Sequence, residues 1–316
     1  MASTNRFGIA VGHATDAAGA TGCTVVMGAT GPLRASAAAL GRATGTREFA
    51  LLEPWASNER VDAILLTGGS AYGLDAAAGV MRWMEERGRG YAIAGGVVPI
   101  VPAAVVFDLA PLGSFAARPT PDMAYAACDA ATESGWAEGS VGVGTGCTVG
   151  KLRGPKFAMK GGVGTAEAGE SVRACAIAAV NAVGHIRDLD GTIIASARND
   201  DGSLADCERL AASGARPGNR GANTTIAVVA FDHVFSKLEL HRIARVATGA
   251  LARRIGPFGS PFDGDVVFAV CATEGPPGDP LAAEVAATHA LELSIVRAVK
   301  TARGRGGPGG LPGLAD

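Results

Sequence analysis

A run of alternating residues that begins at Thr225 is the feature that most constrains the fold of this chain. In it Ile226, Val228 and Ala230 alternate with Thr225, Ala227 and Val229. Alternation with a period of two is typical of a β-strand that presents one face to a core. The small-residue stretch 221–223 precedes the run directly. We therefore expect a turn that leads into a strand, with Thr224 at the exposed start of the strand.

The junction between Asn223 and Thr224 has two interpretations. In the first it is an ordinary loop entering a strand, because Asn and Thr are common in turns. In the second the peptide bond before Thr224 is cut, and the new chain begins with a threonine that carries a hydroxyl and a free α-amine. These two groups are the nucleophile and the base of an N-terminal threonine catalytic pair. An α-amine has a pKa of about 7.7–8.0, so a neutral fraction is available near neutral pH.

Composition limits the class of protein. With 48% hydrophobic and 18% charged residues over 316 positions, the chain has apolar surface for one large domain or two ordinary ones. Aromatic residues are 5%, so we expect a core of small and β-branched side chains. A net charge of −2 without a basic block argues against nucleic-acid binding. The sequence shows neither a membrane-spanning run nor a secretion signal, so we expect a cytoplasmic protein.

No cofactor motif is present. The six cysteines include no Cys-x-x-Cys pair, and the five histidines lack metal-ligand spacing, so we expect reduced thiols, ordinary histidines and no metal or redox cofactor. Two glycine strings, 68–73 and 142–146, invite a nucleotide-binding interpretation. The second breaks the dinucleotide fingerprint at its third glycine, and Gly150-Lys151 is followed by Leu152 instead of Ser or Thr.

The remaining pattern predicts strands mixed with long helices in α+β layers, because no regular βαβ period is visible. Ser236 and Glu239 fit a capping box at the start of a helix. Residues 199–221 are polar and almost aperiodic, and residues 304–316 are rich in Gly and Pro and are expected to be disordered. The other predicted strands are 24–27, 63–66, 172–183 and 265–272, and the other predicted helices are 74–87, 119–136 and 281–302.

Asn223-Thr224-Thr225 resembles the processing site of the L-aminopeptidase/D-esterase family, which includes the nylon-oligomer hydrolases and the β-peptidyl aminopeptidases. Further blocks match in the family's order, and together they cover nearly the whole chain. They are Val11-Gly12-His13, Thr21-Gly22-Cys23-Thr24-Val25-Val26, Gly45-Thr46-Arg47-Glu48, Leu66-Thr67-Gly68-Gly69-Ser70-Ala71-Tyr72-Gly73-Leu74-Asp75, Val98-Pro99-Ile100-Val101-Pro102, Gly144-Thr145-Gly146-Cys147-Thr148-Val149-Gly150-Lys151, Val180-Asn181-Ala182-Val183-Gly184 and Phe262-Asp263-Gly264-Asp265.

The resemblance implies a four-layer α-β-β-α sandwich of the Ntn-hydrolase type, with the DOM-fold topology, as one catalytic domain over residues 1–316. It implies autocatalytic cleavage into an α chain, 1–223, and a β chain, 224–316, that stay together. It also implies homo-oligomers of these cleaved protomers, tetramers or larger, and a small-molecule amide or peptide as substrate. No cofactor is implied.

The resemblance also assigns roles to single residues. Lys151, which on its own reads as an ordinary surface lysine, matches the family's active-site lysine. A desolvated lysine beside a cationic amine would have a lowered pKa. Asn181 lies inside an apolar strand, where an amide is costly unless it is hydrogen-bonded. A structural bond would satisfy it, but the resemblance implies an oxyanion-hole donor.

Asp263 and Asp265 stand two residues apart at the start of a predicted strand and would share one face. A turn explains them equally well, but they match the nylon-oligomer hydrolase branch, where such acids orient the nucleophile. One would pair with Lys151 and the other would orient Thr224, and the sequence leaves open which does which. The resemblance also implies that Tyr72 and Phe107 contact the substrate. Phe107 departs from several relatives that carry tyrosine, so any tyrosine-assisted step is in doubt.

Three functions compete. The first is an autoprocessed N-terminal-threonine amidohydrolase or aminopeptidase that forms an acyl-enzyme on Thr224. The second is acyl transfer to an amine of the ornithine-acetyltransferase type, whose Thr-Met-Leu junction is absent here. The third is an unprocessed binding protein on the same fold, against which the joint presence of Lys151, Asn181, Thr224, Asp263 and Asp265 argues. The natural substrate and endo- versus exo-cleavage are not encoded in any motif.

Overall fold

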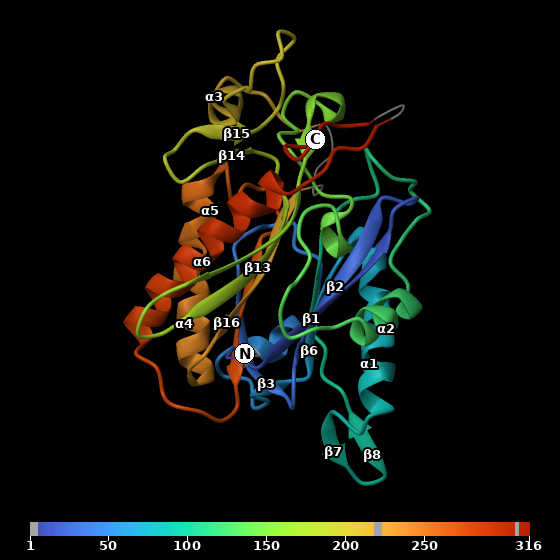
Figure 1. The fold of residues 1–316 in the computed structure, drawn as a ribbon, viewed down its shortest axis with the longest axis vertical. Helices are drawn as coiled ribbons and strands as arrows, with labels where there is room; N and C mark the ends of the chain where they lie inside the picture. Colours follow the sequence, from blue (N-terminus) through green and yellow to red (C-terminus); the bar gives the residue numbers. More distant parts are fainter. Residues whose placement is uncertain (1–5, 218–222, 307–309) are drawn as a thin grey trace.

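The computed structural model describes residues 6–217, 223–306 and 310–316, and two β-sheets lie face to face in it between helices (Figure 1). The first sheet has the order β1-β2-β6-β9-β4. Its strands are β1 (Ile9–Asp16), β2 (Thr21–Gly28), β6 (Ala63–Thr67), β9 (Ala103–Val105) and β4 (Thr46–Arg47). The pair β6 and β9 is parallel, and the other pairs are antiparallel.

The second sheet has the order β12-β13-β16-β18-β3-β5. Its strands are β12 (Gly162–Ala168), β13 (Ala174–Asn181), β16 (Thr224–Phe231), β18 (Val266–Ala272), β3 (Leu33–Ala39) and β5 (Arg60–Val61). β16 is an interior strand, antiparallel to β13 and parallel to β18. The alternating run therefore forms the predicted strand. Thr224, however, is only 3% exposed, which corrects the expectation of an exposed start, because neighbours pair with β16 on both edges.

Helices cover the outer face of each sheet, so the layers run α-β-β-α as predicted (Figure 1). On the first sheet lie α1 (Ala77–Glu85) and α2 (Pro121–Asp129), and on the second α4 (Lys237–Ala247), α5 (Gly249–Arg254) and α6 (Pro280–Lys300). α4 begins with the predicted capping box of Ser236 and Glu239. Within the described ranges, no helix is both long and apolar enough to cross a bilayer.

Three buried apolar clusters lie between these layers. The inner cluster joins the facing sheets, and Phe268 is its largest contributor from the second sheet. Elsewhere the contacts are made largely by alanine and valine, as on β13, where every residue is buried. Small side chains let helices and strands approach closely, so the core is filled with few aromatic rings. This confirms the prediction from composition.

Two predicted helices are shorter than expected. The first turns of the 74–87 segment belong to a 3₁₀ helix, η2 (Ser70–Ala76), and α1 begins only at Ala77. The 119–136 segment stops at Asp129, because Thr132 then exchanges two backbone hydrogen bonds with Val11 of β1. Tertiary pairing overrides local helical periodicity in this second case. The other 3₁₀ helices are η1 (Phe49–Leu52), η3 (Gly142–Gly144) and η4 (Pro155–Phe157).

The polar segment upstream of Thr224 is more ordered than its composition predicts. It contains α3 (Cys207–Ala212), whose N-cap Asp206 accepts hydrogen bonds from the amides of Glu208 and Arg209. Of this segment, residues 218–222 lie outside the described ranges. Three small sheets complete the fold: β7 (Tyr91–Ile93) with β8 (Gly96–Val98), β10 (Thr148–Val149) with β11 (Met159–Lys160), and β14 (His185–Arg187) between β15 (Ile193–Ala195) and β17 (Ile255–Gly256).

The described part of the C-terminal tail makes specific contacts, which differs from the expectation of disorder. Leu311 is 3% exposed in a cluster with Leu112 and Ala158. The amide of Lys160 donates to the carbonyl of Pro312 at 2.9 Å. One buried leucine and a few backbone bonds suffice to hold a Gly/Pro-rich segment that composition alone leaves unplaced.

Replacing Leu311 by alanine should therefore lower the free energy of unfolding by about 2–5 kcal/mol, the usual cost of removing a buried leucine side chain. Urea unfolding followed by circular dichroism measures this change. Leu314, which is 40% exposed, supplies the control, and Leu314→Ala should shift stability by less than about 0.5 kcal/mol. If Leu311→Ala lowered the free energy of unfolding as little as Leu314→Ala, the packing of Leu311 would be contradicted.

Candidate active site

The register of three strands brings the predicted residues around Thr224 together. Thr224 is the cross-strand partner of Asn181 in the pairing of β16 with β13. On the other side Asn223 forms a parallel bridge with Asp263, and the carbonyl of Asn223 accepts the amide of Gly264 at 3.0 Å. The hydroxyl of Thr224 lies 2.5 Å from the same carbonyl oxygen and donates to it. The scissile bond of the predicted cleavage is thus held between two strands.

Lys151 lies beside the cross-strand partner of Thr224. It follows β10, and its amide donates to the carbonyl of Val183, just beyond the end of β13. Its Nζ donates to both the backbone carbonyl and the Oδ1 of Asn181, each at 2.8 Å. Burial of the amine lowers the pKa of Lys151 to about 7, although the Asp263 carboxylate acts in the opposite direction. Desolvation, with a smaller contribution from the charge of Lys160, therefore gives the lowered pKa without a free α-amine at Thr224.

The side chain of Asn181 is fully buried and held at both ends. Its Oδ1 accepts from the amide of Thr148 at 3.0 Å as well as from Lys151. Its Nδ2 donates to the carbonyl of Phe107 at 3.0 Å. The side-chain amide of Asn181 therefore has a structural role. These hydrogen bonds also fix the direction of its Nδ2 donor. A preorganised donor of this kind is also what an oxyanion site requires.

The two aspartates occupy different environments. Asp263 accepts from Ser260, from the backbone amide at 3.0 Å and from the hydroxyl at 2.5 Å. Asp265 accepts from the amide of Thr225 at 2.6 Å and from that of Gly259 at 3.3 Å. Asp265 thus contacts the residue next to Thr224, whereas the charge of Asp263 acts on Lys151. This geometry favours Asp265 as the acid that orients the strand start and Asp263 as the partner of Lys151.

Burial shifts both carboxylates toward the neutral form. Desolvation raises the pKa of Asp263. Desolvation and then the nearby charge of Asp263 raise the pKa of Asp265 to about 7. Two carboxylates so close together and so deeply buried are not both ionised readily, and a shared proton or a cation lowers the cost. Lys151 supplies that cation.

The two residues predicted to contact substrate lie in unlike positions. Phe107 is partly buried, and its backbone carbonyl anchors Asn181. Tyr72 is 55% exposed, and its ring contacts Phe115 and the guanidinium of Arg118, which lies 3.5 Å from the ring centroid. The structure therefore connects Phe107 with the Thr224 group through Asn181. The contacts of Tyr72 are with its own exposed surface cluster.

Two residues that support the site were not singled out from the sequence. Ser260 donates its hydroxyl to Asp263. The sequence feature that could have indicated it is only a serine three residues before the aspartate in a turn. Asp108 accepts from the hydroxyl of Thr21 at 2.7 Å and from the amide of Gly69 at 2.6 Å. Burial raises the pKa of Asp108 to about 6. Its signal was an acid directly after the apolar run that ends at Phe107.

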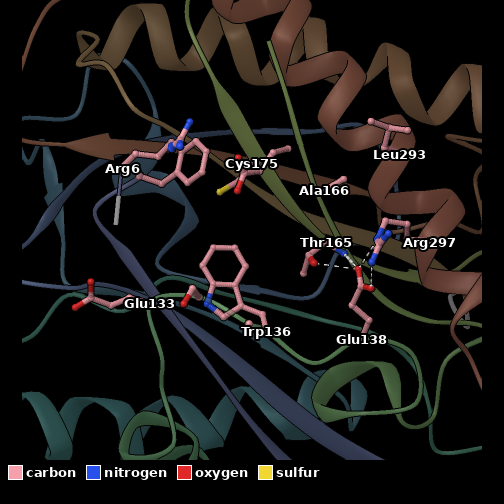
Figure 2. A pocket seen from close by; sticks show the side chains of 13 residues that line it. Arg6, Glu133, Trp136, Glu138, Thr165, Ala166, Cys175, Leu293 and Arg297 are labelled. Atoms are coloured by element: carbon pink, nitrogen blue, oxygen red, sulfur yellow. Dashed lines mark hydrogen bonds and ion pairs between the residues drawn. The ribbon is translucent and has the colours of Figure 1, made fainter. Parts of the chain in front are cut away.

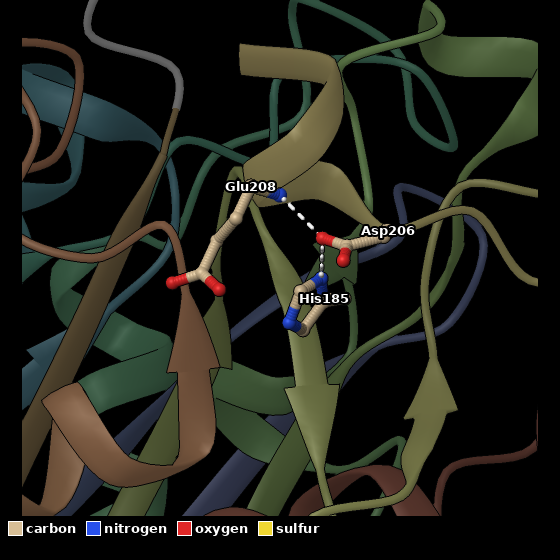
Figure 3. Close-up of side chains that lie close together, drawn as sticks. All are labelled: His185, Asp206 and Glu208. Atoms are coloured by element: carbon tan, nitrogen blue, oxygen red, sulfur yellow. Dashed lines mark hydrogen bonds and ion pairs between the residues drawn. The ribbon is translucent and has the colours of Figure 1, made fainter. Parts of the chain in front are cut away.

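A cluster of His185, Asp206 and Glu208 gathers three groups of the kind that bind metals (Figure 3). Nδ1 of His185 accepts the amide of Cys207 at 3.0 Å, and burial lowers the pKa of His185, so the ring is neutral with its hydrogen on Nε2. Asp206 caps α3, and Glu208 pairs with Arg187 at 2.5 Å. Because the three groups already make these interactions, their arrangement does not fit a cation site. The cluster instead ties β14 to α3.

A cleft of about 520 Å³ lies away from the Thr224 group. It is lined by residues such as Trp136, Glu138 and Arg297, and Figure 2 shows Glu138 directed toward Arg297 and Thr165. Cys175, near the start of β13, also lines it, whereas Asn181 ends that strand. Six residues of strand separate the two positions by about 20 Å. The cleft is therefore distinct from the predicted site.

The sequence profile of peptidase family S58 matches residues 4–310. The chain belongs to this family. An uncharacterized aminopeptidase of Mycobacterium tuberculosis strain H37Rv is 43% identical over 314 residues, which cover 93% of this chain and 88% of that protein. The 6-aminohexanoate-oligomer endohydrolase of Agromyces sp. is 30% identical over 275 residues, or 84% of this chain and 74% of that protein. The resemblance to the L-aminopeptidase/D-esterase family is confirmed, and the chain is a hydrolase that acts on amide bonds.

Solved structures confirm the fold of this S58 hydrolase. The L-aminopeptidase D-Ala-esterase/amidase of Ochrobactrum anthropi, described as a variant of the Ntn-hydrolase fold, superposes with a TM-score of 0.72 at 19% identity and covers 95% of this chain and 86% of that one. A β-aminopeptidase of Burkholderia sp. superposes with a TM-score of 0.70 at 20% identity, over 97% of this chain and 88% of that one.

The buried Asp265 should make stability depend on pH. Its pKa is raised in the folded state, so its neutral form contributes stability that is complete below about pH 4 and is lost as pH rises through about 7. Asp265→Asn should remove this part of the dependence, so that the free energy of unfolding falls less between pH 4 and pH 7. Urea titrations across this range measure it, with the exposed Glu170→Gln as control. Parallel wild-type and Asp265→Asn profiles would contradict the assignment.

Proposed function

We propose that this hydrolase cleaves its own chain between Asn223 and Thr224 and then uses Thr224 as the nucleophile of an aminopeptidase or amidase. The contact that carries the proposal is the 2.5 Å approach of the Thr224 hydroxyl to the carbonyl of Asn223. A hydroxyl next to the carbonyl of its own preceding peptide bond is placed for an N-to-O acyl shift. The products are residues 1–223 and 224–316.

The surroundings of the carbonyl support this reaction. The hydroxyl oxygen would attack the carbonyl carbon of Asn223, and negative charge would collect on an oxygen that already accepts the amide of Gly264. The C–N bond then breaks, the nitrogen takes the proton of the hydroxyl, and an ester remains for water to open. Glycine at position 264 is also needed for space, since a Cβ there would stand 2.6 Å from the carbonyl oxygen of Ala43 and 3.1 Å from the Thr224 hydroxyl oxygen.

Lys151 is suited to move the proton. With a pKa of about 7, its amine is about half neutral at physiological pH and becomes more neutral as pH rises. It is held at Asn181, directly across from Thr224. After cleavage the new α-amine of Thr224 takes over as base for substrate amides. The neighbouring charge of Lys151 would keep that amine in its neutral form.

The class of substrate is a small amide or peptide, as the family indicates. The names of the relatives agree, since they include aminopeptidases and an endohydrolase of 6-aminohexanoate oligomers. We propose that the mature enzyme forms an acyl-enzyme on Thr224 with the carbonyl side of such a bond and releases the amine. Water then releases the acid. Assembly of the cleaved protomers into homo-oligomers is part of the same proposal.

Thr224→Ala should abolish both self-cleavage and hydrolysis, because one hydroxyl performs both. Intact-mass spectrometry should find two chains in the wild type and one in the variant, and sequencing of the smaller wild-type chain should read Thr-Thr-Ile-Ala-Val. Thr224→Ser keeps a hydroxyl and should retain part of each activity. A Thr224→Ala protein that still hydrolyses an amino-acid amide would place the nucleophile elsewhere.

Two substitutions at Asn181 separate its structural and catalytic roles. Asn181→Ala removes the side-chain acceptor of Lys151, although the backbone acceptor remains, and should lower both stability and turnover. Asn181→Asp keeps an acceptor oxygen for Lys151 but replaces the Nδ2 donor by a carboxylate oxygen that faces the carbonyl of Phe107, so we expect a lower melting temperature and, in the protein that remains folded, turnover reduced by about 10²–10³-fold. Melting temperature and turnover number are measured on the same samples. Near-normal turnover in Asn181→Asp would retire the oxyanion role.

A further inference from the structure

A second cavity, of about 300 Å³, lies next to the Thr224 group and has an almost wholly apolar lining. Leu152, Val183, Pro257 and Phe262 line it. Ala215 and Pro217, from the segment upstream of the cleavage junction, line it as well. The volume is at the lower end of those that hold small ligands. No catalytic role in the reaction proposed above uses this space.

The cavity borders the proposed machinery at three points. Leu152 follows Lys151 in the chain, and the lining residue Ser260 donates its hydroxyl to Asp263. Phe262 immediately precedes Asp263, and its carbonyl faces the Nδ2 of Asn223 at 3.5 Å. The walls of the cavity are thus built from residues adjacent to the groups that act on the Asn223 carbonyl.

The contact between the side chain of Asn223 and the backbone carbonyl of Phe262 indicates which part of a substrate would lie near the cavity. In self-cleavage Asn223 is the residue whose carbonyl is attacked, and its side chain is the one directed toward Phe262. A substrate acylates the same hydroxyl, so the side chain of its acyl residue occupies the same direction. The buried Oδ1 of Asn223 has no hydrogen-bond partner among the described residues. This surrounding suits an apolar side chain better than an amide.

We propose, on the basis of the function proposed above, that this cavity binds the side chain of the substrate's acyl residue and selects aliphatic side chains. A charged end is disfavoured, because buried charge without a partner is costly. Among the described lining residues the charged one is Arg216, which is exposed and whose guanidinium donates to the carbonyls of Ala211 and Ala215 at 3.1 and 2.7 Å. The substrate class is therefore amides of amino acids such as norvaline or norleucine.

The test compares p-nitroanilides of alanine and norleucine, which differ by three methylene groups. Burial of each methylene group favours binding by roughly fourfold, so kcat/KM should rise roughly 60-fold from alanine to norleucine. Ala215→Leu fills part of the cavity from a lining residue that has no role in the proposed catalysis. It should reduce this ratio to roughly fivefold or less and leave self-cleavage and alanine p-nitroanilide turnover within about twofold of wild type.

Ala212→Leu is the matched control, because Ala212 ends α3 nearby, is exposed and does not line the cavity. Its ratio should equal that of the wild type. A wild-type ratio near one, or equal ratios in wild type and Ala215→Leu, would overturn the proposal. The second outcome would mean that the protein's own chain fills the cavity or that substrate side chains bind elsewhere.

Measuring the binding of amino-acid amides distinguishes a failure of the cavity proposal from a failure of the proposed amidase function. If the purified protein hydrolyses neither p-nitroanilide, the amidase function fails for this substrate class, and calorimetry with alaninamide and norleucinamide judges the cavity. Norleucinamide should then bind more tightly by the same roughly 60-fold ratio, and Ala215→Leu should remove most of the difference. Equal affinities of the wild type for both amides would overturn the cavity assignment.

Discussion

The pairing of β16 with β13 on one edge and β18 on the other holds the candidate site together. It sets Thr224 opposite Asn181 and brings Asn223 against Asp263. Side chains alternate along a strand, so a slip of one residue would turn every side chain of β16 to the other face. The buried apolar faces on both sides of the sheet oppose such a slip. The hydrophobic core therefore fixes the position of the hydroxyl relative to the carbonyl beside it.

Burial at the ends of these strands also determines the charge state of the site. Lys151 and Asp265 have pKa values of about 7, one lowered and the other raised, because the same desolvation disfavours a buried ammonium and a buried carboxylate. Groups with such values exchange protons readily near neutral pH. Ser260 and the backbone amides of Thr225 and Gly259 supply the hydrogen bonds that make the two acids tolerable there. The burial of these ionisable groups lowers the stability of the fold locally, and the proposed chemistry accounts for their presence there.

The prevalence of small residues serves both the core and the site. Alanine and valine let α6 lie close on β12 and β13, and Gly264 leaves room for the Thr224 hydroxyl. Larger side chains at these places would force the layers apart or displace the reacting groups. The cavity lined by Leu152, Val183 and Ala215 is a gap in this otherwise close packing, and it is the place we propose for the side chain of a substrate's acyl residue.

The sequence by itself determined the strand at Thr225, the capping box of α4 and the mixture of strands and helices in layers, because hydrophobic period and cap residues act locally. The four-layer α-β-β-α order was implied by the family resemblance and not by this pattern. The family blocks also pointed to Lys151, Asn181, Asp263 and Asp265, which the structure brings into one group. Only the tertiary structure decided that Thr224 is buried, that the helix after Pro119 ends at Asp129, and that Leu311 anchors the tail. It also separated the environments of the two aspartates and set the ring of Tyr72 against Phe115 and Arg118. These outcomes depend on contacts between residues distant in the chain, which a local pattern does not contain.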